Sequence, residues 1–288
     1  MGGKSVQAIK LMAIDMDGTL LTTDKELSLV NQESLNQAIE RGHRVVLCTG
    51  RPMSGIKPFL DRLDFTDDDF IIANNGATIL EAKSHRHLMD RGIPSLEMKQ
   101  LVEMALSIGG EGVVVGPNSY YSIKEKANKT IYQDAALIHA TVNYRPFEEL
   151  MEEQEFFYKL LLVDCKEKID AVESRIPQTL RNHYYIVRSQ PYLIEIQAKG
   201  VHKGSGLAWL LKHLGLQKEQ LAAIGDAAND KEMLEMAALA IAMGNASEEI
   251  KALADKVVAS NDDNGVAQAI KFVFEDSIER RAKDEKAK

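Results

Sequence analysis

Residues 8–20 read AIKLMAIDMDGTL, an apolar run followed at once by two carboxylates and a glycine. The apolar part predicts a buried β-strand, because a short apolar run bounded by turn residues is typical of a sheet covered on both faces. Residues two apart in a strand face the same side, so we expect Asp15 and Asp17 to project together from the end of this strand. Open α/β sheets bind ligands at that end. The alternative is an ordinary turn, in which Asp and Gly are common.

The surrounding chain supplies the elements that such a sheet needs. Helices are expected at 28–41 and 52–63, and further strands at 44–48 and 70–73. After Lys203 the alternation returns, with helices expected at 204–214, 229–236, 247–254 and 265–274 and strands at 221–224 and 239–242. Alternating strands and helices predict a parallel sheet, so the fold class is α/β with a Rossmann-like core.

The segment 84–193 breaks this alternation. Its strands are grouped rather than separated by single helices, and they are expected at 113–115, 120–123, 156–163, 184–188 and 192–196, with a helix at 95–108. Such grouping is typical of an α+β domain. We therefore predict an α/β core formed by 1–83 and 194–288, with an α+β domain inserted at 84–193.

Length and composition agree with two soluble domains. The chain has 288 residues, which at about 150 residues per domain gives two. Its 45% hydrophobic and 27% charged residues exclude collagen-like, disordered and disulfide-rich classes. The net charge of -8 disfavours partners that bind through phosphate or lipid anions, so no nucleic-acid or membrane partner is expected.

The cysteines and the apolar runs point to a cytoplasmic protein. Cys48 and Cys165 lie far apart and form no zinc or redox spacing. The longest apolar run, 236–243, is far shorter than the roughly 18 residues that a membrane span needs. The N-terminus has no apolar signal core, so the glycosylation pattern at 245–247 is interpreted as chance. Nothing in the sequence indicates the oligomeric state.

A hydroxyl and a helix start follow the second expected strand, in Cys48-Thr49-Gly50-Arg51-Pro52. Free backbone N–H groups at a helix N-terminus favour a phosphate, and Thr49 adds a donor beside Gly50. The alternative is a capped helix start without a ligand.

A second polar segment, Gly225-Asp226-Ala227-Ala228-Asn229-Asp230, also follows an apolar strand. It brings two carboxylates and an amide to the same sheet edge as Asp15, and Lys203 supplies the point charge that a phosphate site needs. Carboxylates aimed at one point repel each other unless a cation lies between them. Hard oxygen ligands suit Mg²⁺.

Taken in order, these segments resemble the haloacid dehalogenase superfamily of phosphohydrolases. The matching elements are DMDGTL at 15–20, TGR at 49–51, Lys203 and GDxxND at 225–230. Asn75-Gly76-Ala77 and the position of the insert are similar to the Cof-type sugar-phosphatase branch, which carries a large cap domain. The resemblance covers nearly the whole chain.

The resemblance implies a role for each matching residue. Asp15 would attack phosphorus and form an aspartyl phosphate, while Asp17 would act as general acid and then as general base. Mg²⁺ would be bound by Asp15, the backbone carbonyl of Asp17 and Asp226, with Asp230 as a further ligand or an orienting residue. Residues expected to contact the phosphate or the rest of the substrate are Thr49, Gly50, Lys203, Asn229, Arg51 and Asn75.

We therefore expect a Mg²⁺-dependent phosphatase of small phosphorylated metabolites, with sugar phosphates as the first choice. One alternative is a phosphomutase or phosphotransferase that passes the phosphoryl group to a second hydroxyl rather than to water. The other is a regulator that binds a phosphorylated ligand without turnover.

Overall fold

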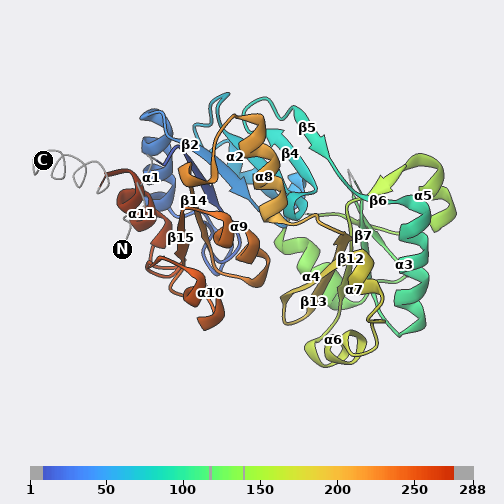
Figure 1. Ribbon diagram of the computed structural model, residues 1–288. Helices are drawn as coiled ribbons and strands as arrows, with labels where there is room; N and C mark the ends of the chain where they lie inside the picture. Colours follow the sequence, from blue (N-terminus) through green and yellow to red (C-terminus); the bar gives the residue numbers. More distant parts are fainter. Residues whose placement is uncertain (1–8, 117–118, 139, 276–288) are drawn as a thin grey trace, which may run out of the picture. The chain divides into compact units, whose positions relative to one another are not determined.

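The structure is a computed structural model that describes residues 9–116, 119–138 and 140–275 (Figure 1). The chain forms two compact units. Among the described residues, the first unit holds 9–49, Phe59–Leu88 and 203–275, and the second holds Gly50–Pro58 and Met89–His202. The predicted boundaries at 83/84 and 193/194 stay a prediction.

The first unit is built on an eight-stranded sheet with the order β16-β15-β14-β1-β2-β3-β4-β5. Its strands are β1 (Leu11–Ile14), β2 (Arg44–Cys48), β3 (Phe70–Ala73), β4 (Thr78–Glu81), β14 (Leu221–Gly225), β15 (Leu239–Ala242), β16 (Lys256–Val257) and the edge strand β5 (His87–Asp90), which passes into the second unit after Leu88. The strands from β16 to β3 are parallel, whereas β4 pairs antiparallel with β3. The predicted parallel α/β sheet is confirmed.

Register places the ends of the central strands at one edge of this sheet. β1 and β14 are buried along their whole length, as expected of parallel strands covered on both faces. Ile14 is paired with Ile224 on one side and with Leu47 on the other. Because the three strands run parallel and in register, the residues that follow them emerge together.

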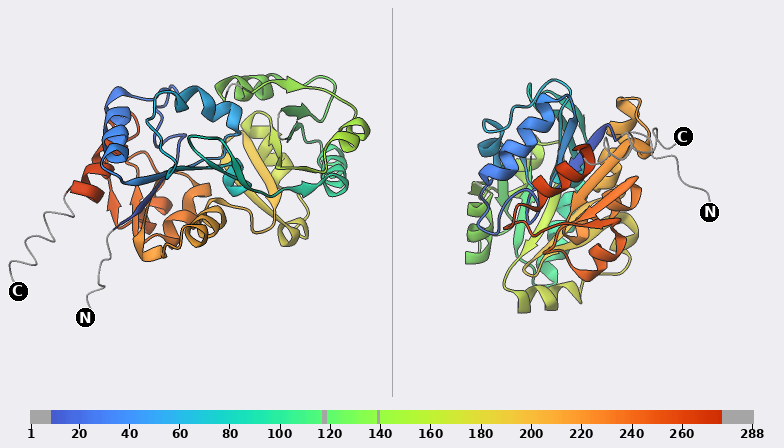
Figure 2. Two further views of the ribbon diagram at one scale, coloured as in Figure 1. Left: turned by 90° about the horizontal axis from the view of Figure 1, so that it is seen from above. Right: turned by 90° about the vertical axis from the view of Figure 1, so that its left-hand side faces the viewer.

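Helices cover both faces of the sheet, and α1 and α10 lie on opposite sides of it in the right-hand view of Figure 2. Contacts join α1 to α11 on one side, and α8 to α9 and α9 to α10 on the other. The helices of this unit are α1 (Leu29–Glu40), α8 (Lys203–His213), α9 (Lys231–Met236), α10 (Glu248–Leu253) and α11 (Gly265–Ile270), with short 3-10 turns at Asn74–Gly76, Lys218–Gln220 and Ala228–Asp230 and a π-helical end at Lys271–Glu275.

Helix α2 (Met53–Leu60) contains residues of both units, because the division falls after Pro58.

Helix α1 shows how the local sequence sets a helix boundary. The Ser28 hydroxyl accepts a hydrogen bond from the Asn31 N–H at 3.2 Å, which satisfies one of the unpaired donors at the helix start. At the other end Gly42 takes a φ of +81°, the left-handed conformation common after a helix. The helix expected at 28–41 is confirmed.

The second unit is an α+β structure, as predicted for the insert. Its six-stranded sheet has the order β12-β13-β11-β7-β8-β9, and a two-stranded sheet pairs β10 with β6. The elements are β6 (Ile93–Pro94), α3 (Ser95–Ser107), β7 (Gly112–Val115), β8 (Tyr120–Ser122), α4 (Lys129–Leu137), β9 (Val142–Asn143), α5 (Phe147–Glu153), β10 (Phe156–Phe157), β11 (Lys159–Val163), α6 (Lys166–Glu173), α7 (Leu180–His183), β12 (Tyr184–Gln190) and β13 (Leu193–Ala198).

One face of the six-stranded sheet forms the apolar core of this unit. Leu160 and Leu162 of β11 and Ile194 and Ile196 of β13 belong to one buried cluster with side chains of α3 and α6. The residues between them on each strand face the other way, because strand side chains alternate.

That other face carries a buried ion pair. The Lys159 ammonium lies 2.6 Å from a carboxylate oxygen of Glu195, and both side chains are about 5% exposed or less. The same ammonium also donates to the backbone carbonyl of Gly50 at 2.7 Å.

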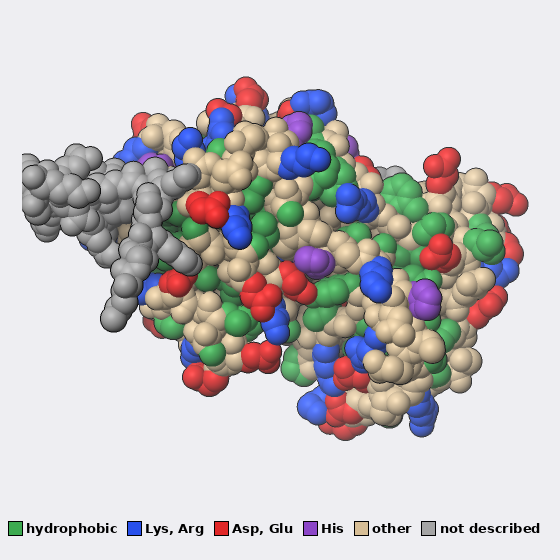
Figure 3. Space-filling view, viewed as in Figure 1, with side chains coloured by type: hydrophobic (Ala, Val, Ile, Leu, Met, Phe, Trp, Pro, Cys, Tyr) green, Lys and Arg blue, Asp and Glu red, His purple; other side chains and the backbone are tan. Residues whose placement is uncertain are grey.

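The surface is mixed in charge, and none of the described helices is long and apolar enough to cross a membrane. On the face drawn in Figure 3, acidic and basic side chains are interspersed. The expectation that the protein binds no nucleic acid stays a prediction.

Candidate active site

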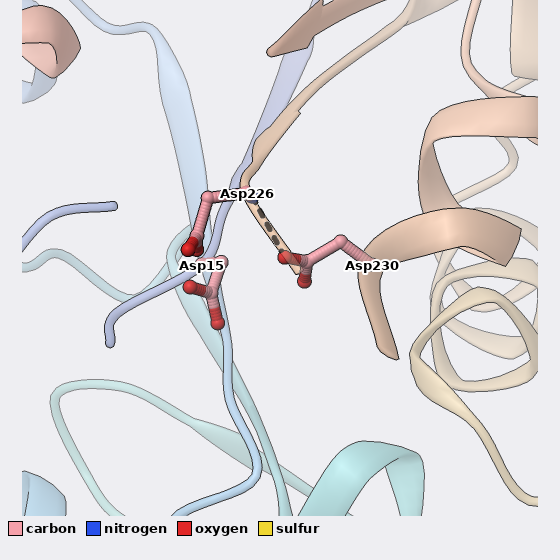
Figure 4. Close-up of side chains that lie close together, drawn as sticks. All are labelled: Asp15, Asp226 and Asp230. Atoms are coloured by element: carbon pink, nitrogen blue, oxygen red, sulfur yellow. Dashed lines mark hydrogen bonds between the residues drawn. The ribbon is translucent and has the colours of Figure 1, made fainter. Parts of the chain in front are cut away.

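Three carboxylates from distant parts of the sequence meet at the edge where β1 and β14 end (Figure 4). Asp15 directly follows β1, Asp226 directly follows β14, and Asp230 closes the 3-10 turn Ala228–Asp230. Each offers an oxygen, and the three oxygens lie within 4.8 Å of one another. This is the close approach that the parallel register and the sequence pattern predict.

Asp230 organises this group through its own hydrogen bonds. Its Oδ2 accepts from the backbone N–H groups of Asp226 at 2.9 Å and of Ala227 at 3.0 Å. Its Oδ1 accepts from the Lys203 ammonium at 2.6 Å. Because both of its oxygens accept hydrogen bonds, Asp230 fixes the position of the Lys203 ammonium relative to the loop that follows β14.

Lys203, the first residue of α8, lies between two of the carboxylates. Its fully buried ammonium is 2.5 Å from Asp15 Oδ1 and 2.6 Å from Asp230 Oδ1. Burial alone would lower the pKa of the lysine, but the carboxylates of Asp15 and Asp230 outweigh this and raise it. Lys203 is therefore positively charged throughout the physiological pH range.

The carboxylates carry more negative charge than this lysine neutralises. Burial, and after it the negative charge of Asp230, raise the pKa of Asp15 well above its ordinary value. The same two causes raise the pKa of Asp226 to about 7. A buried group whose charged form is disfavoured in this way is stabilised by a nearby cation.

The donor set at this edge fits a divalent cation. Asp15 Oδ2 is a buried oxygen without a hydrogen-bond partner, although the Oδ1 of the same carboxylate is bonded to Lys203. Buried polar atoms are almost always satisfied, so an exception here calls for an explanation such as an ion. Carboxylate oxygens are the ligands that Mg²⁺ prefers.

Asp226 is held from its other side by residues that the sequence analysis did not assign to the site. The Thr19 hydroxyl donates to Asp226 Oδ1 at 3.0 Å. The Asn245 amide donates to Asp226 Oδ2 at 3.4 Å and to the Gly18 carbonyl at 2.8 Å. Asn245 comes shortly after β15 and reaches the same sheet edge. A polar residue after an apolar strand predicts a site residue, but in the sequence this asparagine is interpreted only as part of a chance glycosylation pattern.

Gly18 is required here for two reasons. Its φ of +82° lies in the left-handed region, which side chains with a Cβ disfavour. A Cβ at this position would also lie 2.5 Å from Asp226 Oδ2. The turn after β1 therefore passes close enough to Asp226 that only glycine fits.

Asp17 lies near this group but is not one of its three carboxylates. The Asp15 N–H still donates to the Ile224 carbonyl of β14 at 3.1 Å, but the chain turns at Met16, so strand alternation does not extend to Asp17. Asp17 Oδ1 forms an ion pair with the Lys25 ammonium at 2.9 Å. Metal binding through its backbone carbonyl stays a prediction.

Thr49 and Asn229, two of the predicted phosphate-binding residues, are connected through Asn75. Thr49 directly follows β2, is fully buried, and its carbonyl accepts from the Asn75 N–H at 2.9 Å. The Asn229 amide donates to Asn75 Oδ1 at 3.1 Å. These three residues and Lys203 belong to the first unit, whose sheet edge carries the carboxylates.

Gly50 and Arg51 fall in the second compact unit, although Gly50 is bonded directly to Thr49. The Arg51 guanidinium is buried and donates to the Gly55 carbonyl at 2.9 Å. Their predicted contacts with the phosphate and the substrate stay predictions.

Comparison with known proteins shows the family. The pattern of the haloacid dehalogenase-like hydrolases matches residues 12–270 of this chain. The Bacillus subtilis phosphatase YwpJ is 32% identical over 92% of this chain and 100% of its own length. A second protein of that species, the 5-amino-6-(5-phospho-D-ribitylamino)uracil phosphatase YwtE, is 30% identical over 91% of this chain and 97% of its own length.

The fold comparison agrees. The solved structure of BT4131, described as a sugar phosphatase of haloacid dehalogenase subclass IIB, matches with a TM-score of 0.76 at 25% identity. The match covers 91% of this chain and 98% of that structure. Thus the chain belongs to the haloacid dehalogenase-like hydrolases, and within that family it is a hydrolase of phosphoric monoesters.

Proposed function

We propose that the chain hydrolyses phosphorylated small metabolites, with sugar phosphates as its main substrates, and that it uses Mg²⁺. The observation that carries this proposal is the environment of Asp15. One of its oxygens is bonded to a buried lysine, the other has no hydrogen-bond partner, and two further carboxylates lie within 4.8 Å. This is an oriented carboxylate nucleophile beside a place for a divalent cation.

In the first step, the Asp15 carboxylate oxygen attacks phosphorus and the bond between phosphorus and the substrate oxygen breaks. Asp17 gives a proton to the departing alkoxide, so the product leaves as an alcohol. Lys203 donates to Asp15 Oδ1 at 2.5 Å and so orients the nucleophile. The product of this step is an aspartyl phosphate on Asp15.

In the second step, water attacks the phosphorus of the aspartyl phosphate. Asp17, now ionised, accepts a proton from that water, and the bond between phosphorus and the Asp15 oxygen breaks. Inorganic phosphate leaves and both aspartates return to their starting states. A single group thus serves as acid and then as base, and the proton that Asp17 gives up in the first step is replaced in the second.

Mg²⁺ would be held by Asp15 and Asp226, with the Asp17 carbonyl as a further ligand. When bound, it would neutralise charge on the phosphoryl oxygens and on the clustered carboxylates. Asp230 is the less suitable direct ligand, because its oxygens already accept three hydrogen bonds. We therefore assign it the task of orienting Lys203 and the loop that carries Asp226.

Thr49, Lys203 and Asn229 would bind the phosphoryl oxygens. A hydroxyl, an ammonium and an amide together supply the donors that phosphoryl transfer needs for positioning and charge neutralisation. Gly50 would add its backbone N–H, and Arg51 would contact the rest of the substrate.

The choice of sugar phosphates is supported by BT4131, which is described as a sugar phosphatase. The competing choice is a phosphorylated ribityl compound, since YwtE is named for that substrate. Both are phosphate monoesters of polyhydroxylated carbon chains, which is the coarser class that the two matches share.

Phosphate release from a substrate panel tests this proposal. Purified protein is treated with EDTA, Mg²⁺ is added back, and hexose phosphates, pentose phosphates, ribitol phosphate and p-nitrophenyl phosphate are compared by kcat/KM. We expect activity to vanish without the metal and to return with it, with a sugar phosphate highest in the panel.

Other outcomes separate the alternatives. Isomerised sugar phosphate without free phosphate would identify a phosphomutase, and phosphate binding without any turnover would identify a regulator. The cytoplasmic location expected from the sequence stays a prediction, as does action on small metabolites rather than on macromolecules.

A further inference from the structure

Strand β3 is followed by a turn in an unusual backbone conformation. Asn74, Asn75 and Gly76 have φ values of +50°, +54° and +95°, so two consecutive residues with a Cβ lie in the left-handed region. All three are buried. Asn tolerates this conformation better than most residues, but a buried pair is held there only by its surroundings, and such residues cluster at functional sites.

Asn75 connects two residues that are distant in sequence. Its backbone N–H donates to the Thr49 carbonyl at 2.9 Å, and its Oδ1 accepts from the Asn229 amide at 3.1 Å. Thr49 follows β2, whereas Asn229 lies in the turn after β14. The left-handed conformation allows one residue to present its N–H and its side chain to both.

These two bonds limit the freedom of the groups proposed to bind phosphate. The Thr49 backbone is held at both ends, since its N–H also donates to the Ile72 carbonyl at 2.8 Å. The Asn229 amide has two N–H donors, and one of them is used on Asn75. The direction of the second N–H is then set by the planarity of the amide.

The turn is also packed tightly from behind. Gly206 of α8 lies so near that a Cβ there would be 3.1 Å from the Gly76 Cα and 2.9 Å from Ile72 Cγ2. Helix α8 begins with Lys203, so the helix that carries the lysine supports the turn directly. A turn held by backbone contact cannot shift easily to follow a changed side chain.

We propose that Asn75 is a positioning residue, which aims the Asn229 amide at the phosphoryl group and fixes the Thr49 backbone. This inference rests on the proposed function, because it takes Thr49 and Asn229 as phosphate-binding residues. It differs from the expectation that Asn75 contacts the substrate itself, since here Asn75 acts through other residues.

Asn75→Gly is the decisive substitution. Glycine keeps the left-handed backbone and the N–H that donates to Thr49, but it removes the oxygen that holds Asn229. The matched control is His85→Gly, because His85 is another non-glycine residue in the left-handed region, with a φ of +57°, in an exposed turn. Both substitutions relieve the same type of backbone strain.

Three quantities are measured for each protein: the Kd of inorganic phosphate by calorimetry with Mg²⁺ present, kcat and KM with p-nitrophenyl phosphate, and the urea midpoint. We expect Asn75→Gly to raise the Kd of phosphate about 10-fold, because a change of this size corresponds to the loss of one hydrogen bond to a charged group. We expect His85→Gly to leave Kd and the kinetic constants unchanged. A purely structural role would change the urea midpoint of Asn75→Gly without changing Kd.

A double-mutant cycle with Asn229→Ala completes the test. Asn229→Ala alone should raise the Kd of phosphate, and adding Asn75→Gly should raise it no further, because the amide to be aimed is gone. If Asn229→Ala raises Kd but Asn75→Gly does not, or if the two increases multiply, the positioning role is refuted and the proposed function stands. If Asn229→Ala leaves Kd unchanged, the phosphate-binding role of Asn229 is refuted, and the positioning role with it.

Discussion

Replacing Lys203 with Met removes a positive charge that contacts both Asp15 and Asp230. The two contacts measure 2.5 and 2.6 Å, and all three side chains are buried. Removing one partner of a buried ion pair costs about 3–5 kcal/mol, because the remaining charges are left uncompensated. We expect a loss of this size in the unfolding free energy of the first unit when divalent metal is absent.

Mg²⁺ should restore part of this loss, since a bound cation replaces the missing positive charge beside the carboxylates. The assay is urea unfolding in EDTA and in Mg²⁺, followed by tryptophan fluorescence. Trp209 is the only tryptophan of the chain and lies on α8, the helix that begins with Lys203, so it reports on the unit that carries the site. We expect Mg²⁺ to stabilise Lys203→Met more than the unsubstituted protein.

A matched control is Lys159→Met, which removes an equally buried lysine from the side of Glu195 in the second unit. Its stability loss, followed by circular dichroism, should be the same in EDTA and in Mg²⁺. In addition, Lys203→Met combined with Asp230→Asn should recover stability without metal, because one uncompensated charge is removed. The reasoning is refuted if Lys203→Met costs less than about 1 kcal/mol, or if Mg²⁺ stabilises the variant and the unsubstituted protein equally.

Three further predictions follow from individual residues. Asp15→Asn should lower kcat by at least about 10³-fold. It should not lower the metal-free unfolding free energy, because the amide carries no negative charge and so escapes the desolvation and the repulsion by Asp230 that raise the pKa of Asp15. Substantial residual turnover would exclude Asp15 as the nucleophile. Gly18→Ala should weaken Mg²⁺ binding measured by calorimetry, because its Cβ would lie 2.5 Å from Asp226 Oδ2. The control is Gly42→Ala, since Gly42 has a similar φ but a Cβ there would have no atom within 4 Å. We expect Gly42→Ala to lower only the stability of the protein. Burial, and after it the charge of Arg41, lower the pKa of His43 in the folded chain. As the pH falls below about 6.5, the unfolded chain therefore binds a proton at His43 before the folded chain does, and stability should decrease. If the urea midpoint of His43→Gln shows the same pH dependence, His43 is not the group responsible.

Much of the site could be predicted because it depends on strand ends. Asp15, Thr49 and Asp226 each follow an apolar run directly, and parallel pairing brings such positions to one edge. The expected alignment of Asp17 with Asp15 assumed strand alternation beyond Asp15, whereas the chain turns at Met16. The catalytic and metal-binding roles of Asp17 stay a prediction. A strand boundary depends on pairing with neighbours, which periodicity alone does not show.

The amino-acid order was sufficient for the fold class, for the family and for the residue types at the sheet edge, because apolar periodicity and turn residues act over a few neighbouring positions. Which atoms meet was settled by tertiary packing. Lys203 reaches Asp15 across 188 positions, and Asn75 reaches Asn229 across 154. Such hydrogen bonds depend on register, helix placement and left-handed turns, all of which are set by the whole folded unit. The chemistry of the site therefore depends on contacts that no local segment specifies.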